Sequence, residues 1–155
     1  MAGKIDARLA ELSITLPTPA APVANYVPFV KIGNLVFLSG QLPIKDGKPS
    51  HLGKAGGERT AEEAQEAARN CAINIIAQLK AACDGDLDRV KRIVRLGGFV
   101  ASTPDFTDQP KVINGASDLM VEVFGDAGRH CRTAVAAPSL PMDVTVEIDG
   151  IAEIE

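Results

Sequence analysis

Hydrophobic and polar residues alternate strictly at the C-terminal end of the chain. From Asp143 to Glu155, every second residue is apolar or small, and most of the residues between them are acidic. Successive side chains of a strand point to opposite faces, so this pattern predicts a long strand with one buried and one acidic face. The predicted buried set is Val144, Val146, Ile148, Gly150, Ala152 and Ile154, and the opposite set is Thr145, Glu147, Asp149, Ile151, Glu153 and Glu155.

Two longer segments have the period of amphipathic helices. Thr60 and Glu63 form a capping-box pattern that opens the first helix, whose apolar stripe runs to Ala82 before Gly85. Pro110 stands at a first helical position of the second helix. The stripe of this second helix is Val112, Ile113, Ala116, Leu119, Met120, Val123 and Phe124, followed by Gly125.

Three apolar runs in the first hundred residues predict strands. Residues 29–32 and 35–39 flank Gly33-Asn34, a strong two-residue hairpin signal. The run 35–38 is apolar throughout, which predicts a strand covered on both faces. Residues 90–100 predict a third strand, in which Gly97-Gly98 marks a bulge or a close approach of another element.

The N-terminal part has a different character. Residues 4–13 predict a brief amphipathic helix, and the Pro/Ala linker Thr18 to Pro22 cannot continue it. We therefore divide the chain into an N-terminal extension, residues 1–24, and one domain, residues 25–155. Within the domain, residues 45–58 predict a polar, glycine-rich loop.

The predicted elements follow the order β-β-α-β-α-β-β, once the short run of small residues opened by Arg132 is counted as a strand. This order predicts an α+β fold with a sheet and two helices packed on one of its faces. The other face carries carboxylates and small residues. A second copy of the chain is a better cover for that face than a second domain.

Composition sets limits on the partners. The chain has 155 residues, of which 46% are hydrophobic, enough for one sizeable core. A formal net charge of −4 and a pI near 5.2 argue against nucleic-acid binding. The basic residues between Arg89 and Arg95 have a spacing more typical of a solvated face than of a phosphate-binding track.

The cysteines indicate a reducing compartment. Cys71, Cys83 and Cys131 are an odd number and lack CxxC spacing. The chain shows no signal-type N-terminal segment and no apolar run near the roughly 20 residues that a membrane span needs. We therefore expect a cytoplasmic protein with free thiols.

Arg132 and Glu147 are the candidate chemical pair. They stand on two successive predicted strands joined by a Pro-bracketed loop, and both can face one cleft. There, Arg132 can hold an anion with two parallel hydrogen bonds, and Glu147 can move a proton of water. The alternatives are a strand-end surface arginine and a solvated carboxylate among several on its strand face.

Other catalytic patterns are weak. His51 and His130 are isolated histidines and make no metal site. No Ser–His–acid set and no phosphate-binding loop is apparent. His130 and Cys131 are adjacent in a strand, so their side chains point to opposite faces and do not pair. We therefore expect chemistry that needs neither a metal nor a cofactor.

Two motifs together resemble the RidA/YjgF family of reactive-intermediate deaminases. One is R-T-A-V at residues 132–135, followed by L-P at 140–141 and V-T-V-E-I at 144–148. The other is Asn25-Tyr26 with the hairpin that ends in S-G-Q-L-P at residues 39–43. The resemblance covers residues 25–155. It implies a chorismate-mutase-like fold with a mixed sheet, a homotrimer, and ligand clefts between subunits.

The resemblance also implies roles for single residues. Arg132 matches the arginine that grips a substrate carboxylate, and Glu147 the glutamate associated with water activation. Asn114 is separated from Arg132 by one residue more than the family pattern has. The implied substrate-binding positions are Tyr26, Ser39, Asn114 and the backbone carbonyl of Ala134.

The expected function is hydrolysis of reactive 2-imino or enamine acids to a 2-keto acid and ammonia. The segments Val27-Pro28-Phe29 and Ala137-Pro138-Ser139 depart from the family pattern and leave the substrate open. One alternative is a non-catalytic binder of small carboxylates with the same fold. Another is an endoribonuclease, which the acidic charge balance and the lack of a histidine pair disfavour.

Overall fold

The computed structural model describes residues 3–19, 21 and 24–155. Its strands and helices, in chain order, are α1 (Lys4–Glu11), β1 (Phe29–Ile32), β2 (Leu35–Gln41), β3 (Ile44–Lys45), β4 (Lys48–Pro49), α2 (Ala61–Ala82), β5 (Val90–Ala101), α3 (Gln109–Phe124), β6 (Cys131–Ala137) and β7 (Val146–Ile154). Short 3-10 turns cover Leu87–Arg89, Gly125–Gly128 and Pro141–Asp143.

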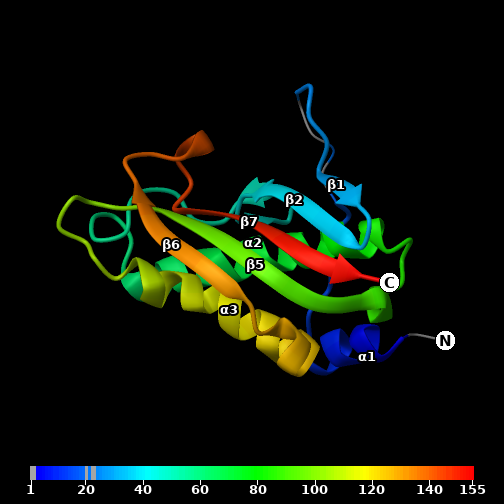
Figure 1. Cartoon of the computed structure of the whole chain (residues 1–155). Helices are drawn as coiled ribbons and strands as arrows, with labels where there is room; N and C mark the ends of the chain where they lie inside the picture. Colours follow the sequence, from blue (N-terminus) through cyan, green and yellow to red (C-terminus); the bar gives the residue numbers. More distant parts are fainter. Residues whose placement is uncertain (1–2, 20, 22–23) are drawn as a thin grey trace.

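The main layer is a five-stranded sheet in the order β1-β2-β7-β5-β6. Strands β5 and β6 are parallel, whereas the other neighbouring pairs are antiparallel, so the sheet is mixed. Helices α2 and α3 pack together on one face of this sheet (Figure 1). The predicted α+β fold and its element order are confirmed.

The alternation predicted for the last strand holds from Val146 onward. Val146, Ile148 and Ala152 are fully buried, and Glu147 and Asp149 are partly exposed. The prediction was wrong for Thr145, which is fully buried and donates its hydroxyl to the carbonyl oxygen of Gly53 at 2.8 Å. Thr145 lies outside β7, which begins at Val146, so the alternation of that strand does not set the direction of this side chain.

Two further expectations need correction. The apolar run in β2 was predicted to be covered on both faces, but Leu35 and Phe37 are 36% and 39% exposed. The helices cover only the face that carries Val36 and Leu38. The segment expected to be a loop includes the β3–β4 hairpin, in which Ile44 pairs with Pro49.

The helices follow the predicted patterns closely. The Thr60 hydroxyl accepts from the backbone N–H of Glu63, and the Glu63 carboxylate accepts from the backbone N–H of Thr60, both at 3.1 Å. Every residue of the predicted α3 stripe is buried. Gly98 of β5 is a point of close approach, because a Cβ there would overlap the side chain of Ile113.

The N-terminal helix is tied to the rest of the structure. Asp88 accepts from the backbone N–H groups of Lys4 and Ile5, both at 2.8 Å, and Leu9 is buried in the common core. Residues 20 and 22 of the expected linker lie outside the described residues. The division into an extension and a domain stays a prediction.

No helix within the described part of the chain is long and apolar enough to cross a membrane.

Gly115 lets α2 and α3 approach closely, which gives a testable prediction. A Cβ at this position would overlap the backbone carbonyl of Gln65 in α2. Gly115→Ala should therefore lower the free energy of unfolding by about 1–3 kcal/mol, the usual range for overpacking. Urea denaturation measures this, with Gly57→Ala as control because a Cβ at Gly57 makes only ordinary contacts. Equal stability of both variants would contradict the close packing.

Candidate functional site

Arg132 is held in a fixed position by α3. In the parallel pair β5–β6 it lies opposite the buried Leu96, so its side chain leaves the sheet on the helix side. The guanidinium Nη1 donates to Asn114 Oδ1 at 2.8 Å and to Ser117 Oγ at 3.1 Å. Its Nη2 donates to the backbone carbonyl of Pro110 at 3.1 Å. Arg132 is therefore not a free surface arginine.

The three hydrogen bonds leave part of the guanidinium available. An arginine has five N–H donors in a rigid plane. Both hydrogens of Arg132 Nη1 have partners, while the Nε hydrogen and one Nη2 hydrogen have none among the described residues. These two hydrogens can bind one carboxylate with two parallel hydrogen bonds. Ala134, two residues further along β6, lies on the same side of the sheet opposite Gly98.

Two residues near Arg132 were not assigned a role from the sequence. Ser117 follows Asn114 by three residues, so both lie on the same side of α3 and reach the same guanidinium. His130 lies on the far side of Ser117, with its Nε2 at 2.9 Å from Ser117 Oγ. Ser117 could have been identified from the sequence by its spacing of three residues, about one helical turn, from Asn114.

Glu147 occupies a different environment on β7. It lies opposite Phe99 of β5 and lines a shallow pocket of about 220 Å³ with Gly40, Leu140 and Asp149. A Cβ at Gly40 would overlap the Glu147 carboxylate, so a larger residue there would displace this side chain from its present position. Burial, and secondarily the charge of Asp149, raise the pKa of Glu147 above its ordinary value of 4.5.

Tyr26 and Ser39 line a separate cavity next to the Glu147 pocket. This cavity has a volume of about 270 Å³, and Gly40 is the one residue that lines both. The Ser39 hydroxyl donates to the carbonyl oxygen of Val27 at 2.7 Å, and Tyr26 is 53% exposed. Ser39 is therefore the sequence neighbour of the glycine that lies against the Glu147 carboxylate.

The predicted site residues therefore form two separate groups. Arg132 pairs with Leu96 and Glu147 pairs with Phe99, three positions further along β5. An odd separation along a strand reverses the face, so Arg132 and Glu147 lie on opposite faces of the sheet. The expectation that the two face one cleft is not met within a single chain. We call Arg132, Asn114 and Ala134 the arginine group, and Tyr26, Ser39 and Glu147 the glutamate group.

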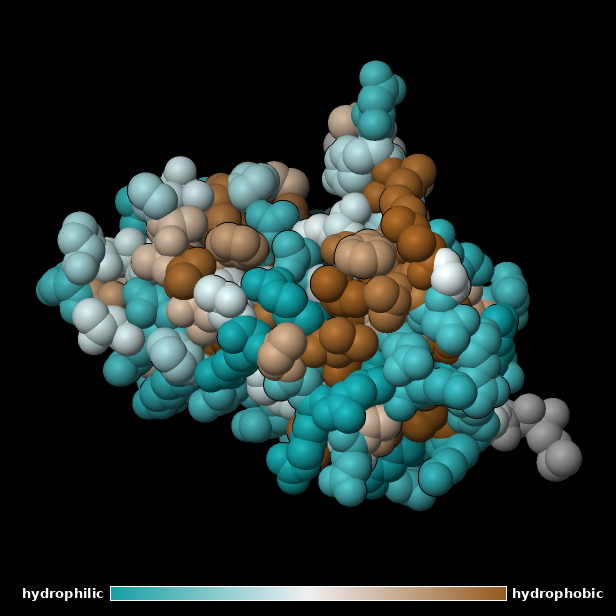
Figure 2. All heavy atoms as spheres, viewed as in Figure 1, coloured by the Kyte–Doolittle hydropathy of each residue, from teal (hydrophilic) through white to brown (hydrophobic). Residues whose placement is uncertain are grey.

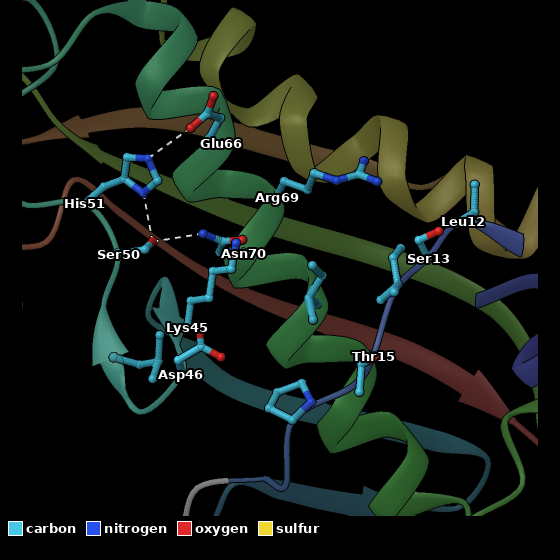
Figure 3. Close-up of a pocket in the computed structure, with 14 residues that line it drawn as sticks. Leu12, Ser13, Thr15, Lys45, Asp46, Ser50, His51, Glu66, Arg69 and Asn70 are labelled. Carbon is cyan, nitrogen blue, oxygen red and sulfur yellow. Dashed lines mark hydrogen bonds and ion pairs between the residues drawn. The ribbon is translucent and has the colours of Figure 1, made fainter. Parts of the chain in front are cut away.

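A larger groove lies along α2. It has a volume of about 730 Å³. On one side, His51 is 2.7 Å from Ser50 through Nδ1 and 3.3 Å from Glu66 through Nε2, while the Asn70 amide donates to the Ser50 hydroxyl at 2.9 Å. Figure 3 shows these four residues joined by dashed lines, across the groove from Leu12, Ser13 and Thr15.

A linked Ser–His–acid set was not apparent in the sequence, and the structure corrects this. Ser50 and His51 are adjacent, but Glu66 comes from α2, fifteen residues later. The Glu66 side chain is 73% exposed, so solvent screens its effect on the imidazole. The clearest consequence of this network is that it joins the segment after β4 to α2.

The same fold and sequence pattern occur in other proteins. Residues 6–154 match the family model described as "YjgF/chorismate mutase-like, putative endoribonuclease". The chain is 48% identical to Protein TCP17 of Trypanosoma cruzi, over 98% of this chain and 95% of that one. The crystal structure of Atu1372 from Agrobacterium tumefaciens, a protein of unknown function, is 51% identical, with a TM-score of 0.92 over 97% and 92% of the two chains.

More distant relatives have an enzymatic name. The 2-iminobutanoate/2-iminopropanoate deaminase of Escherichia coli K12 is 29% identical over 91% of this chain and 98% of its own length. The deaminase name thus accompanies the shared sequence pattern at the level of the family.

The raised pKa of Glu147 predicts a pH-dependent stability. Because the folded state keeps this carboxyl protonated to a higher pH than the unfolded state does, it binds more protons in that window. The free energy of unfolding therefore falls as pH rises from the unfolded pKa through the folded one. Glu147→Gln removes this loss, so its stability relative to the wild type should increase as the pH rises from the ordinary glutamate value of 4.5 through the raised pKa of the folded state.

Urea denaturation across that range measures the difference. Asp149→Asn is the comparison variant. It removes the secondary cause of the shift and should retain most of the effect, because burial is the larger cause. A constant difference between Glu147→Gln and the wild type at all pH values would contradict the raised pKa.

Proposed function

Because the chain belongs to the YjgF/chorismate mutase-like family, we propose that it hydrolyses reactive 2-imino or enamine acids to 2-keto acids and ammonia. The observation that carries this proposal is the guanidinium of Arg132, which α3 fixes with two donors left for a carboxylate. A 2-imino acid presents such a carboxylate next to its electrophilic carbon.

The reaction needs few protein groups. Water adds to the C=N carbon and gives a carbinolamine, the nitrogen takes up a proton, and ammonia leaves as the carbonyl of the keto acid forms. Arg132 holds the carboxylate so that the C=N carbon stays in place. Glu147 accepts a proton from the attacking water, a role suited to a carboxylate whose raised pKa makes it a stronger base than an ordinary glutamate.

In this proposal, two copies of the chain complete the cleft. The arginine group of one copy faces the glutamate group of another, because one chain holds them on opposite sheet faces. Among the described residues, no helix covers the face that carries Glu147, and this face exposes apolar side chains. Figure 2 shows hydrophobic atoms gathered on this face over β1 and β2. The exposed set includes Val30, Ile32, Leu35, Phe37, Phe99 and Val135.

An endoribonuclease activity has less support than the deaminase activity. General acid–base cleavage of RNA commonly uses a pair of histidines, as a proton donor and an acceptor. The two histidines here belong to separate hydrogen-bond networks, His51 with Glu66 and His130 with Ser117. The formal net charge of −4 also opposes binding of a polyanion.

The proposed cleft predicts a homotrimer, as the family resemblance implies. Burial of the apolar sheet face between copies stabilises the assembly. Multi-angle light scattering at micromolar concentration should give the mass of three 16.2 kDa chains. Phe37→Lys places a charge on this face and should shift the mass toward the monomer, whereas Lys48→Glu on the β3–β4 hairpin should not. A monomer mass for the wild type would contradict the proposal.

Arg132→Lys tests the function directly. Lysine keeps the charge but loses the planar pair of donors, so turnover of imines generated in situ by an amino-acid oxidase should fall about 100-fold or more. Arg59→Lys is the matched control, since the Arg59 guanidinium, like that of Arg132, bonds a backbone carbonyl and a side-chain oxygen. Wild-type turnover in Arg132→Lys would contradict the carboxylate-binding role.

Glu147→Gln separates an enzyme from a binder in the same assay. It leaves Arg132 intact, so affinity for a stable keto acid such as pyruvate should persist in calorimetry. Turnover should fall about 100-fold, the usual scale for a positioned acid or base. Unchanged turnover would favour the non-catalytic carboxylate binder.

A further inference from the structure

Ser117 and His130 form a chain of hydrogen bonds that ends at Arg132. His130 Nδ1 is 2.6 Å from the carbonyl oxygen of Gly128, and its Nε2 is 2.9 Å from Ser117 Oγ. Ser117 Oγ in turn is 3.1 Å from Arg132 Nη1. His130 immediately precedes β6, two residues before Arg132, and Ser117 projects from α3.

The chemistry of the end groups fixes the direction of two of the three hydrogen bonds. A carbonyl oxygen only accepts, so His130 Nδ1 carries a hydrogen and donates it to Gly128. A guanidinium only donates, so Ser117 Oγ accepts from Arg132. In the tautomer with its hydrogen on Nδ1, His130 accepts the Ser117 hydroxyl hydrogen at Nε2. One consistent arrangement satisfies all three groups.

We propose that Ser117 and His130 are positioning residues that orient the Arg132 guanidinium for the substrate carboxylate. The inference rests on the proposed function, because it assumes that Arg132 binds that carboxylate. Asn114 and Ser117 together occupy both hydrogens of Nη1. His130 holds the Ser117 hydroxyl in the rotamer in which its lone pair faces Arg132. The two free donors then point in one fixed direction.

In the proposal, His130 acts by accepting a hydrogen bond from Ser117 at Nε2. Two substitutions separate this contact from the hydrogen bond between Nδ1 and Gly128. His130→Gln can place an amide oxygen near the former Nε2 position and still accept from Ser117. His130→Asn reaches only the former Nδ1 position, where its amide can donate to Gly128 but not accept from Ser117. For Ser117, Thr keeps the hydroxyl and Ala removes it.

The experiment measures pyruvate affinity by calorimetry and imine turnover for the four variants. Ser117→Ala and His130→Asn should weaken affinity and raise KM about tenfold, the scale of a hydrogen bond to a charged group, with a smaller change in kcat. Ser117→Thr and His130→Gln should stay within about threefold of the wild type. His51→Asn, in the groove along α2, is the control for loss of an imidazole.

Two results would overturn the inference. One is wild-type affinity and KM in Ser117→Ala and His130→Asn. The other is an equal loss in the conservative variants and in the Ala and Asn variants at matched urea stability. Arg132→Lys in the same series distinguishes the two proposals. If it loses affinity while Ser117→Ala does not, only the positioning role fails, and if it binds pyruvate like the wild type, both proposals fail.

Discussion

The structure depends on a sheet that is covered on one face only. Strand β7 lies in its centre, and its alternate residues are either fully buried under the helices or turned to the open face. Burial of the apolar set supplies most of the favourable free energy that such a strand can contribute. The same alternation leaves Glu147 and Asp149 beside one another on the open face. The position of the carboxylates is thus a consequence of how the core is built.

The two groups of site residues have complementary electrostatics. Arg132 is a cation whose hydrogen bonds to α3 hold it in place without an acidic partner among its contacts. Glu147 is a carboxylate in which burial disfavours the charged form. In the proposed cleft between two copies, a substrate carboxylate on Arg132 would neutralise the cation. The pKa of Glu147 would then stay raised, which favours its role as a proton acceptor.

Features set by neighbours in the sequence could be predicted. The Thr60 capping box, the Gly33-Asn34 hairpin and the α3 stripe all depend on residues a few positions apart, and each matches the structure. The close approach at Gly98 was likewise predicted, because glycine within a strand indicates missing space for a side chain.

Features set by distant contacts could not be predicted in this way. Thr145 is buried because it bonds Gly53, 92 residues away. The relation of Arg132 to Glu147 depends on β5, which separates their strands and fixes both registers. Periodicity assigns the residues of each strand to two faces. Only the pairing with β5 shows which face of β6 and which face of β7 lie on the same side of the sheet. For this reason the sequence pointed to the right strands for both residues but not to their position on opposite faces of the sheet.

The central claim is that a working cleft combines Arg132 of one copy with Glu147 of another. Mixing the inactive variants Arg132→Lys and Glu147→Gln, then unfolding and refolding them together in equal amounts, tests it most directly. Random assembly gives about a quarter of the clefts both native residues, so imine turnover should recover to about a quarter of the wild-type rate. Each variant refolded alone should stay inactive. Turnover of the mixture no higher than that of the separate variants would contradict the shared cleft.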